Sequence, residues 1–296
     1  MSVVLITGSS TGIGMATVLH LAAKGHKVYA SMRNLAGGDD LRSAASAAGV
    51  AVDLIQLDVT DEASVKRAVA EVVEREGRID ALVNNAGIAP LGPVEEMDVE
   101  TFKSVYETNV FGVLRCVRAV LPAMRKQQSG SIVNISSTAG HISSICSGAY
   151  ASSKFALEGM SEALAQEVRP FGIHVALVKP GFIITPIFGK ALGELSTHSD
   201  SAYPNAVKIA NDLFTNGQQI GDPAEMVAET VEEAINDKTL RLRYPVGDPA
   251  RAILAARADM TDEEWVDLGR HKTLDAFLGE ILSHMPQPPS SAAIQI

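Results

Sequence analysis

The sequence predicts a single α/β domain built on a doubly wound parallel sheet of about seven strands, with helices on both faces. From Val3 to Lys179, short apolar runs of strand length alternate with longer amphipathic stretches of helical period. The apolar runs are continuous rather than alternating, as expected when helices cover both faces of a parallel sheet. A glycine-rich turn, residues 8–14, directly follows the first run and leads into the first helical stretch.

Six apolar runs are predicted as strands, and a seventh segment alternates apolar and charged residues. The strands are Val3–Thr7, Lys27–Met32, Ala51–Leu57, Ala81–Asn84, Ser131–Ser136, His174–Lys179 and Leu240–Val246. The helices predicted between them are Ile13–Ala23, Asp39–Ala48, Asp61–Glu76, Val99–Met124 and Tyr150–Arg169. Strands that alternate with helices form right-handed βαβ units, which produce this kind of sheet.

The alternation of strands and helices ends after Lys179. Residues 182–220 carry mixed helical and loop signals, and we expect them to form a mobile lid over a substrate. A helical stretch with the tryptophan Trp265 follows a capping pattern that starts at Thr261. No linker rich in Gly, Ser or Pro divides the chain, so we expect residues 1–285 to form one domain and residues 286–296 a flexible tail.

The composition is that of an ordinary globular protein, with 46% hydrophobic and 20% charged residues. The net charge of −10 argues against a nucleic-acid or anionic-membrane partner, because both need a cationic surface. We see no signal peptide and no apolar run of the roughly 18 residues that a membrane span needs. Cys116 and Cys146 are too few for a disulfide framework, and no histidine has metal-ligand spacing, so we expect a cytoplasmic protein without a metal.

The glycine-rich turn reads Thr7-Gly8-Ser-Ser-Thr11-Gly12-Ile13-Gly14. Glycines permit positive φ and close backbone approach, and the free amides at the start of the following helix attract phosphate. The spacing differs from the Gly-x-Gly-x-x-Gly fingerprint of dinucleotide sites. A phosphate-binding turn is the favoured interpretation, and a tight turn without a ligand is the alternative.

Tyr150 and Lys154 stand four residues apart, so in a helix they share one face. A neighbouring ammonium is expected to lower the pKa of the phenol from its usual value of about 10. A proton donor tuned in this way suits general acid catalysis on a carbonyl. A Tyr-x-x-x-Lys pair also occurs often by chance, so the rest of the chain must decide its meaning.

Together the motifs resemble the short-chain dehydrogenase/reductase family. Besides the turn and the Tyr150/Lys154 pair, they comprise Asn84-Asn-Ala-Gly87, Ser137 and Pro180-Gly181 followed by Thr185, all in the family's order. Ser137 precedes Tyr150 by thirteen residues. The resemblance extends from Val3 to about Val246 and implies a Rossmann-type fold. It is strongest to the branch that contains the 17β-hydroxysteroid and retinol dehydrogenases.

The resemblance implies a catalytic set of Asn109, Ser137, Tyr150 and Lys154. Tyr150 would act as the general acid in reduction and the base in oxidation, and Lys154 would lower its pKa and bind the nicotinamide ribose. Ser137 would donate a hydrogen bond to the substrate oxygen, and Asn109 would hold a water molecule in a proton relay. For Asn109 the alternative is a polar residue fitted into a buried helix.

The implied cofactor-binding residues lie at the ends of the strands, where open α/β sheets bind ligands. Asp58 would bond the adenine amino group, although it could instead be a helix cap. The set is Gly8, Ser10, Thr11, Gly12, Ile13, Gly14, Arg33, Asp58, Val59, Asn85, Ala86, Gly87, Tyr150, Lys154, Pro180, Gly181, Ile183 and Thr185.

The end of the second strand bears on the choice between the two nicotinamide dinucleotides. Met32 occupies the position where NAD-dependent members of the family often place aspartate, and Arg33 could pair with a 2′-phosphate. We therefore expect NADP rather than NAD. A solvated arginine is the alternative, and Ser10 stands where some NADP enzymes of the family have a cationic residue.

These observations predict an NADP(H)-dependent oxidoreductase that interconverts a ketone or aldehyde and an alcohol. Apolar residues of the lid suggest a bulky lipophilic substrate, steroid-like or aromatic, although they could equally pack against the body of the protein: Phe182, Ile184, Ile187, Phe188 and Leu192. Cys146 could border the substrate pocket. By resemblance, the helices at 99–124 and 150–169 would pair subunits in a homodimer or homotetramer.

Three alternatives remain open. A non-catalytic nucleotide sensor on the same fold would usually have lost part of the Asn-Ser-Tyr-Lys set, which is complete here. A sugar-nucleotide epimerase or dehydratase would show a different glycine spacing and a longer C-terminal substrate domain. A 3-oxoacyl reductase belongs to the same family and differs only in its substrate. Fold alone does not separate these functions.

Overall fold

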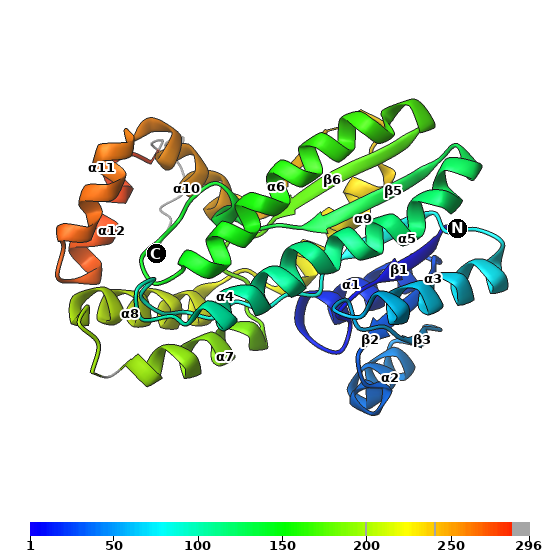
Figure 1. Cartoon of the computed structure of the whole chain (residues 1–296), viewed down its shortest axis with the longest axis horizontal. Coiled ribbons are helices and arrows are strands. Elements are labelled where there is room, and N and C mark those ends of the chain that lie inside the picture. The colour runs from blue at the N-terminus through cyan, green and yellow to red at the C-terminus, as the bar shows by residue number, and fades with distance from the viewer. Residues whose placement is uncertain (199, 240, 286–296) are drawn as a thin grey trace.

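A computed structural model describes residues 1–198, 200–239 and 241–285 (Figure 1). Its centre is a seven-stranded parallel sheet with the strand order β3-β2-β1-β4-β5-β6-β7. The strands are β1 Val3–Ile6, β2 Lys27–Met32, β3 Asp53–Gln56, β4 Ala81–Asn84, β5 Gly130–Ile135, β6 Ile173–Lys179 and β7 Arg243–Pro245. The predicted fold class is confirmed, and six predicted strands agree to within two residues at each end.

The seventh predicted strand is shorter than expected. Leu240 lies outside the described residues, and β7 comprises only Arg243–Pro245, which pairs in parallel with Leu177–Lys179 of β6. The predicted tail, residues 286–296, also lies outside the described residues.

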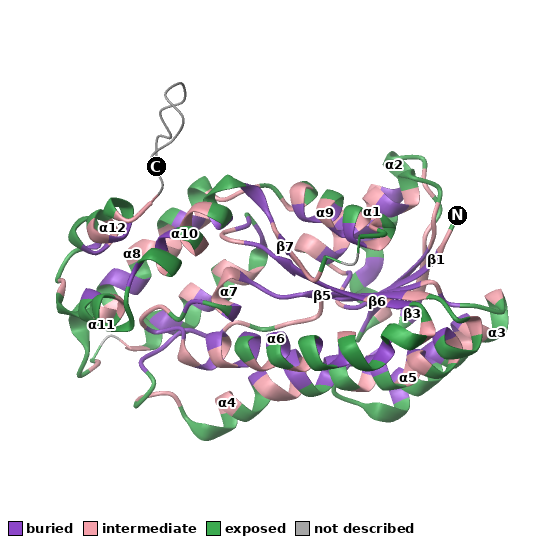
Figure 2. Ribbon diagram, turned by 90° about the horizontal axis from the view of Figure 1, so that it is seen from above, coloured by how far each residue is buried: buried purple, intermediate pink, exposed green. Residues whose placement is uncertain are grey.

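Helices cover both faces of the sheet (Figure 2). One face carries α3 Glu62–Glu76, α4 Val99–Tyr106, α5 Gly112–Gln127 and α6 Gly148–Val168. The other carries α1 Gly12–Ala23, α2 Asp39–Ala47 and α9 Ala224–Asn236. Each face buries its own apolar cluster, which explains why the strands are apolar on both sides.

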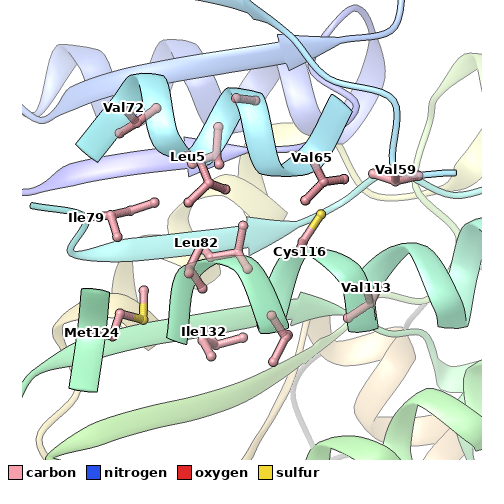
Figure 3. Close-up of a cluster of buried hydrophobic side chains, with 14 of the residues drawn as sticks. Leu5, Val59, Val65, Val72, Ile79, Leu82, Val113, Cys116, Met124 and Ile132 are labelled. Atoms are coloured by element: carbon pink, nitrogen blue, oxygen red, sulfur yellow. The ribbon is translucent and has the colours of Figure 1, made fainter. Parts of the chain in front are cut away.

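The core beneath α3 and α5 is shown in Figure 3. Leu5, Leu82 and Ile132 rise from β1, β4 and β5 and pack against both helices. Cys116 of α5 is fully buried in this cluster, and burial raises the pKa of its thiol to about 12. Cys116 is therefore a core residue.

The single regular helix predicted over Val99–Met124 is wrong. A π-helical segment, Glu107–Phe111, separates α4 from α5. Within it Asn109 is buried, and its amide exchanges two hydrogen bonds of 2.9 Å with the backbone of Ile88. Such interruptions occur often at functional sites. The periodicity of the sequence does not predict the interruption, because the bonds come from a loop 21 residues away.

Beyond β6 the chain forms two layers at the end of the sheet. The predicted lid contains α7 Pro186–Leu195 and α8 Pro204–Ile220. The C-terminal helices α10 Gly247–Asp259, α11 Asp262–Asp267 and α12 Leu274–Ser283 lie beside α8 (Figure 1). They bury one apolar cluster with it: Ile209, Ala256, Met260, Leu268, Leu274, Phe277 and Ile281. Within the described ranges, no helix is both long and apolar enough to cross a membrane.

Candidate active site

The glycine-rich turn is locked to the turn that follows β4. The Thr7 hydroxyl accepts hydrogen bonds from the backbone amides of Asn85 (3.0 Å) and Ala86 (3.1 Å). The Asn85 side chain donates in return to the carbonyl oxygens of Thr7 and Gly8, both at 2.9 Å. Asn85, which the resemblance places beside adenosine, therefore uses its side-chain amide to join the two central strands.

Two glycines make this close approach possible. Gly8 has a φ of +68°, and a Cβ there would lie 2.8 Å from the Cα of Ala86. A Cβ on Gly14 would lie 2.3 Å from the Gly8 carbonyl oxygen and 2.5 Å from Nδ2 of Asn85. All three distances are too short for a Cβ, so neighbouring atoms require glycine at both positions, and at Gly8 the positive φ requires it as well.

The start of α1 can accept an anion. Its N-cap residue, Thr11, makes no side-chain capping hydrogen bond, and its first turn contains no acidic residue. The first amides of a helix have no partner within the helix and carry a partial positive charge. The turn at residues 8–14 therefore fits a dinucleotide pyrophosphate, as the sequence predicts.

The expected nicotinamide residues lie next to this turn. A Cβ on Gly12 would approach the side chain of Thr185 to 3.3 Å, so the start of α1 and the start of α7 are neighbours. Thr185 and Ile183 are buried. The Thr138 amide donates to the Pro180 carbonyl oxygen at 2.9 Å, which ties the Pro180-Gly181 segment to the loop that begins at Ser137.

The end of β2 presents Arg33 to solvent and buries its neighbours. Arg33 is exposed, and no ion pair of its side chain is found among the described residues. Met32 packs into the core. Ser31 is fully buried, its Oγ has no hydrogen-bond partner in the described chain, and its carbonyl oxygen accepts from the amide of Ser9 in the glycine-rich turn.

Asp58 follows β3 and is not the cap of α3, because Asp61 performs that role by accepting from the Ala63 amide. One Asp58 oxygen, Oδ1, accepts from the amide (2.9 Å) and the hydroxyl (2.8 Å) of Thr60. The neighbouring Val59 is buried and packs against Gly112. The alternative interpretation of Asp58 as a helix cap is thereby excluded.

Ser137, Tyr150 and Lys154 come together where β5 ends and α6 begins. Ser137 is buried and caps a short 3₁₀ turn by accepting from the Ala139 amide at 3.1 Å. Tyr150 lies in the first turn of α6. The Lys154 ammonium lies 5.5 Å from the centre of the Tyr150 ring and donates to the Ile135 carbonyl oxygen at 2.8 Å.

The pKa values of this pair move in the direction that burial dictates. Burial raises the pKa of Tyr150 to about 12, although the Ser137 hydroxyl acts in the opposite direction. Burial lowers the pKa of Lys154 to about 8, and the negative charge of Glu158 counteracts that shift. The predicted fall of the Tyr150 pKa is therefore not produced by the protein groups alone, because loss of solvation outweighs the effect of the Ser137 hydroxyl.

Asn109 lies near Tyr150 and Lys154, and three hydrogen bonds hold its side chain. In addition to the two bonds with Ile88, its Nδ2 donates to the Ser153 hydroxyl at 3.0 Å. Ser153 in turn donates to the Tyr150 carbonyl oxygen at 2.7 Å. The side chain therefore connects the π-helical segment to the first turn of α6, next to Lys154.

The lid packs on the loop before Tyr150. Phe182, Phe188 and Phe214 form an aromatic triangle with ring centres 5.5 to 6.0 Å apart. Cys146 is buried in one cluster with Ala191 and Leu195 of α7, so it does border the lid. Burial raises the pKa of its thiol to about 11, and its φ is +59°, a strained value for a residue other than glycine.

One cluster at this site was missed from the sequence. Glu158, four residues after Lys154, is buried and accepts from the Ser136 hydroxyl at 2.7 Å and from Nε of Arg243 at 2.8 Å. Lys179, at the end of β6, is also buried, with its Nζ 3.7 Å from the Glu158 carboxylate. Two features of the sequence could have indicated this cluster. Lys179 ends an apolar strand, and Glu158 follows Lys154 by one helical turn. In the described part of the chain, no three His, Cys, Asp or Glu residues group as a metal site.

Comparison with known proteins agrees with this geometry. Residues 2–194 match the model of the short chain dehydrogenase family. Human retinol dehydrogenase 8 is 41% identical over 250 residues, covering 81% of this chain and 79% of that protein. Human 17-beta-hydroxysteroid dehydrogenase type 1 is 35% identical over 271 residues, covering 87% and 81%.

A solved short-chain dehydrogenase from Streptomyces avermitilis superposes with a TM-score of 0.77 at 34% identity, covering 91% of this chain and 96% of that one. Fold, motif order and sequence thus agree over most of the chain. The protein belongs to the short-chain dehydrogenase family, and it is an oxidoreductase of the branch similar to the retinol and 17β-hydroxysteroid dehydrogenases.

Proposed function

We propose that this oxidoreductase interconverts a ketone or aldehyde and an alcohol with NADP(H). The observation that carries the proposal is the placement of Ser137, Tyr150 and Lys154 beside the Pro180-Gly181 segment, close to a glycine-rich turn suited to a pyrophosphate. Enzymes of this family use NAD or NADP, and a nicotinamide bound here would supply or accept the hydride.

The protein groups handle the proton and the developing charge. In the reduction, the Ser137 hydroxyl donates a hydrogen bond to the carbonyl oxygen, and the Tyr150 phenol transfers its proton to that oxygen as the new C–H bond forms. In the oxidation, the Tyr150 phenolate takes the hydroxyl proton. The Lys154 ammonium stabilises the phenolate in both directions. This pairing counteracts burial, which disfavours the charged form of both side chains.

We further propose a bulky lipophilic substrate. Phe182, Phe188 and Phe214 provide an apolar wall at the lid, and Ile184 is 50% exposed although it is a large apolar residue. Two relatives named for retinol and for a hydroxysteroid support the same class of substrate.

Turnover of a panel of ketones and alcohols, from small to steroid-sized, tests this function with NADPH/NADP and NADH/NAD in parallel. We expect turnover to favour the phosphorylated cofactor and the large apolar substrates. Nucleotide binding without turnover of any panel member would favour the nucleotide sensor. Preferential turnover of 3-oxoacyl thioesters would favour the 3-oxoacyl reductase.

Arg33 is proposed to select NADP over NAD. It is exposed at the end of β2, it is free of ion pairs within the described chain, and the acid expected in an NAD site is replaced by the buried Met32. Arg33→Ala is expected to weaken NADPH binding about 10- to 100-fold, the worth of one or two charge-assisted hydrogen bonds. Fluorescence titration with NADPH and NADH measures both dissociation constants.

The control is Arg67→Ala, which removes another exposed arginine, one that lies on α3 and pairs with Asp61. It should change neither dissociation constant by more than about twofold, because solvent and salt screen the effect of an exposed charge outside the proposed site. If Arg33→Ala weakened NADPH and NADH equally, the assignment of Arg33 to the 2′-phosphate would be wrong.

The subunit contact through the helices at 99–124 and 150–169 stays a proposal. Phe111 and Leu114, at the junction of the π-helical segment with α5, and Phe155 of α6 are 46%, 38% and 47% exposed. Apolar side chains of this size on adjacent helices favour a homodimer or a homotetramer. Sedimentation velocity measures the number of subunits.

A further inference from the structure

A buried charge cluster lies directly behind the catalytic lysine. Lys154 and Lys179 are the two buried lysines in the described ranges, and Glu158 is the one buried acid there. Glu158 is four residues from Lys154 on α6, and its Oε1 lies 3.7 Å from Nζ of Lys179. A single buried carboxylate thus pairs with Lys179 and stands one helical turn from Lys154.

Every oxygen of Glu158 is occupied, so its position is fixed. Oε1 accepts from the Ser136 hydroxyl at 2.7 Å, and Oε2 accepts from Nε of Arg243 at 2.8 Å. Gly140 packs against the same side chain, because a Cβ there would lie 2.9 Å from Cγ of Glu158. The carboxylate is therefore held by β5, β7 and the loop after Ser137.

Lys179 connects this cluster to the surface. Its Nζ lies 2.6 Å from Nδ1 of His141, whose side chain is 44% exposed. His141, Lys179 and Arg243 line a cavity of about 460 Å³ beside α10. Burial and the charge of Lys179 lower the pKa of His141, so the ring is kept neutral and can accept a hydrogen bond from the ammonium.

Buried charges are costly unless they are paired, and an unpaired Lys154 would lose its proton. Lys154 faces the ring of Tyr150, and Glu158 lies one turn further along the same helix, where its negative charge acts on Lys154. Lys179, Arg243 and His141 gather around Glu158. Glu158 is the only negative charge among them. Arg243 also pairs with Glu162, which is more than half exposed and lies one turn further along α6.

We propose that Glu158 is a positioning residue that keeps Lys154 protonated, and that Lys179 limits this effect by competing for the same carboxylate. The proposal rests on the function proposed for Lys154. It predicts that the balance between Glu158 and Lys179 sets the upper pH limit of catalysis, because a neutral Lys154 cannot stabilise the Tyr150 phenolate.

The test is a pH titration of the protein without nucleotide. NMR signals of lysines labelled with ¹³C at Cε give the titration midpoint of each lysine. Spectra of Lys154→Arg and Lys179→Met assign the two signals. In Glu158→Gln, which retains the shape of the side chain, the Lys154 midpoint should fall by about one pH unit. In Lys179→Met it should rise, because Lys179 then no longer offsets the negative charge of Glu158.

Glu162→Gln is the matched control, since Glu162 lies on the same helix as Glu158 and also pairs with Arg243. This variant should leave the Lys154 midpoint unchanged. The alkaline limb of kcat/KM should move with the midpoint in each variant. Unchanged midpoints in both Glu158→Gln and Lys179→Met would overturn the proposal. If Glu158→Gln failed to fold by circular dichroism, the direction of the Lys179→Met shift would decide alone.

This titration needs neither cofactor nor substrate, so its outcome is separate from that of the proposed function. Shifted midpoints without any ketone turnover would support the cluster and count against the reaction. Ketone turnover with unchanged midpoints would support the proposed reaction and count against the role of Glu158 and Lys179.

Discussion

Replacing Tyr150 by phenylalanine is expected to lower kcat about a thousandfold while nucleotide binding is unchanged. The substitution removes one oxygen, and with it the group proposed to exchange a proton with the substrate. General acid and base groups typically contribute 10²- to 10⁴-fold to a rate. The ring remains, so its contact with the Lys154 ammonium is preserved. Initial rates at saturating ketone, together with NADPH fluorescence titration, measure both quantities.

Tyr106→Phe is the control, because Tyr106 ends α4 and lies outside the proposed catalytic set. Its kcat should remain within about twofold of the wild type. A Tyr150→Phe variant that retains a third or more of the wild-type kcat would remove Tyr150 from the mechanism, whatever its effect on KM.

Gly14→Ala is expected to abolish nucleotide binding and to lower the free energy of unfolding by about 2–4 kcal/mol. The added methyl group would lie 2.3 Å from the Gly8 carbonyl oxygen and 2.5 Å from the Asn85 amide nitrogen. One of these groups belongs to the backbone, so the turn itself must shift. The shift would break the bonds that join the turns after β1 and β4.

Gly279→Ala provides the comparison for helix propensity. Gly279 lies within α12, is exposed, and has no atom within 4 Å of the position of an added Cβ. The same chemical change should there raise the free energy of unfolding by about 0.5–1 kcal/mol. Urea unfolding of both variants measures the difference, and equal effects would show that contact with Gly8 and Asn85 is not the cause.

Most of the fold could be predicted because buried parallel strands have a simple sequence pattern. Strands such as Lys27–Met32 and Ala81–Asn84 were predicted with their exact bounds, since helices on both faces require apolar residues at most positions. The tight turn after the first strand could also be predicted, because close backbone approach leaves few alternatives to glycine.

What could not be predicted depends on contacts between distant segments. The π-helical interruption is stabilised by hydrogen bonds between Asn109 and Ile88, which periodicity does not reveal. The pKa of Tyr150 was predicted to fall because spacing shows Lys154 but not the depth of burial. The charge cluster around Glu158 draws on β5, β6, β7 and α6, so no local pattern contains it.

The place of β1 in the sheet has a consequence for synthesis on the ribosome. β1 is the first strand to emerge, yet it pairs on one side with β2 and on the other with β4, which begins at Ala81. Until β4 is translated, an apolar strand edge of the nascent chain has no partner, and such edges favour aggregation. The glycine-rich turn can gain its bonds to Asn85 only after that pairing. The proposed nucleotide site is therefore assembled late, although its first residues are translated first.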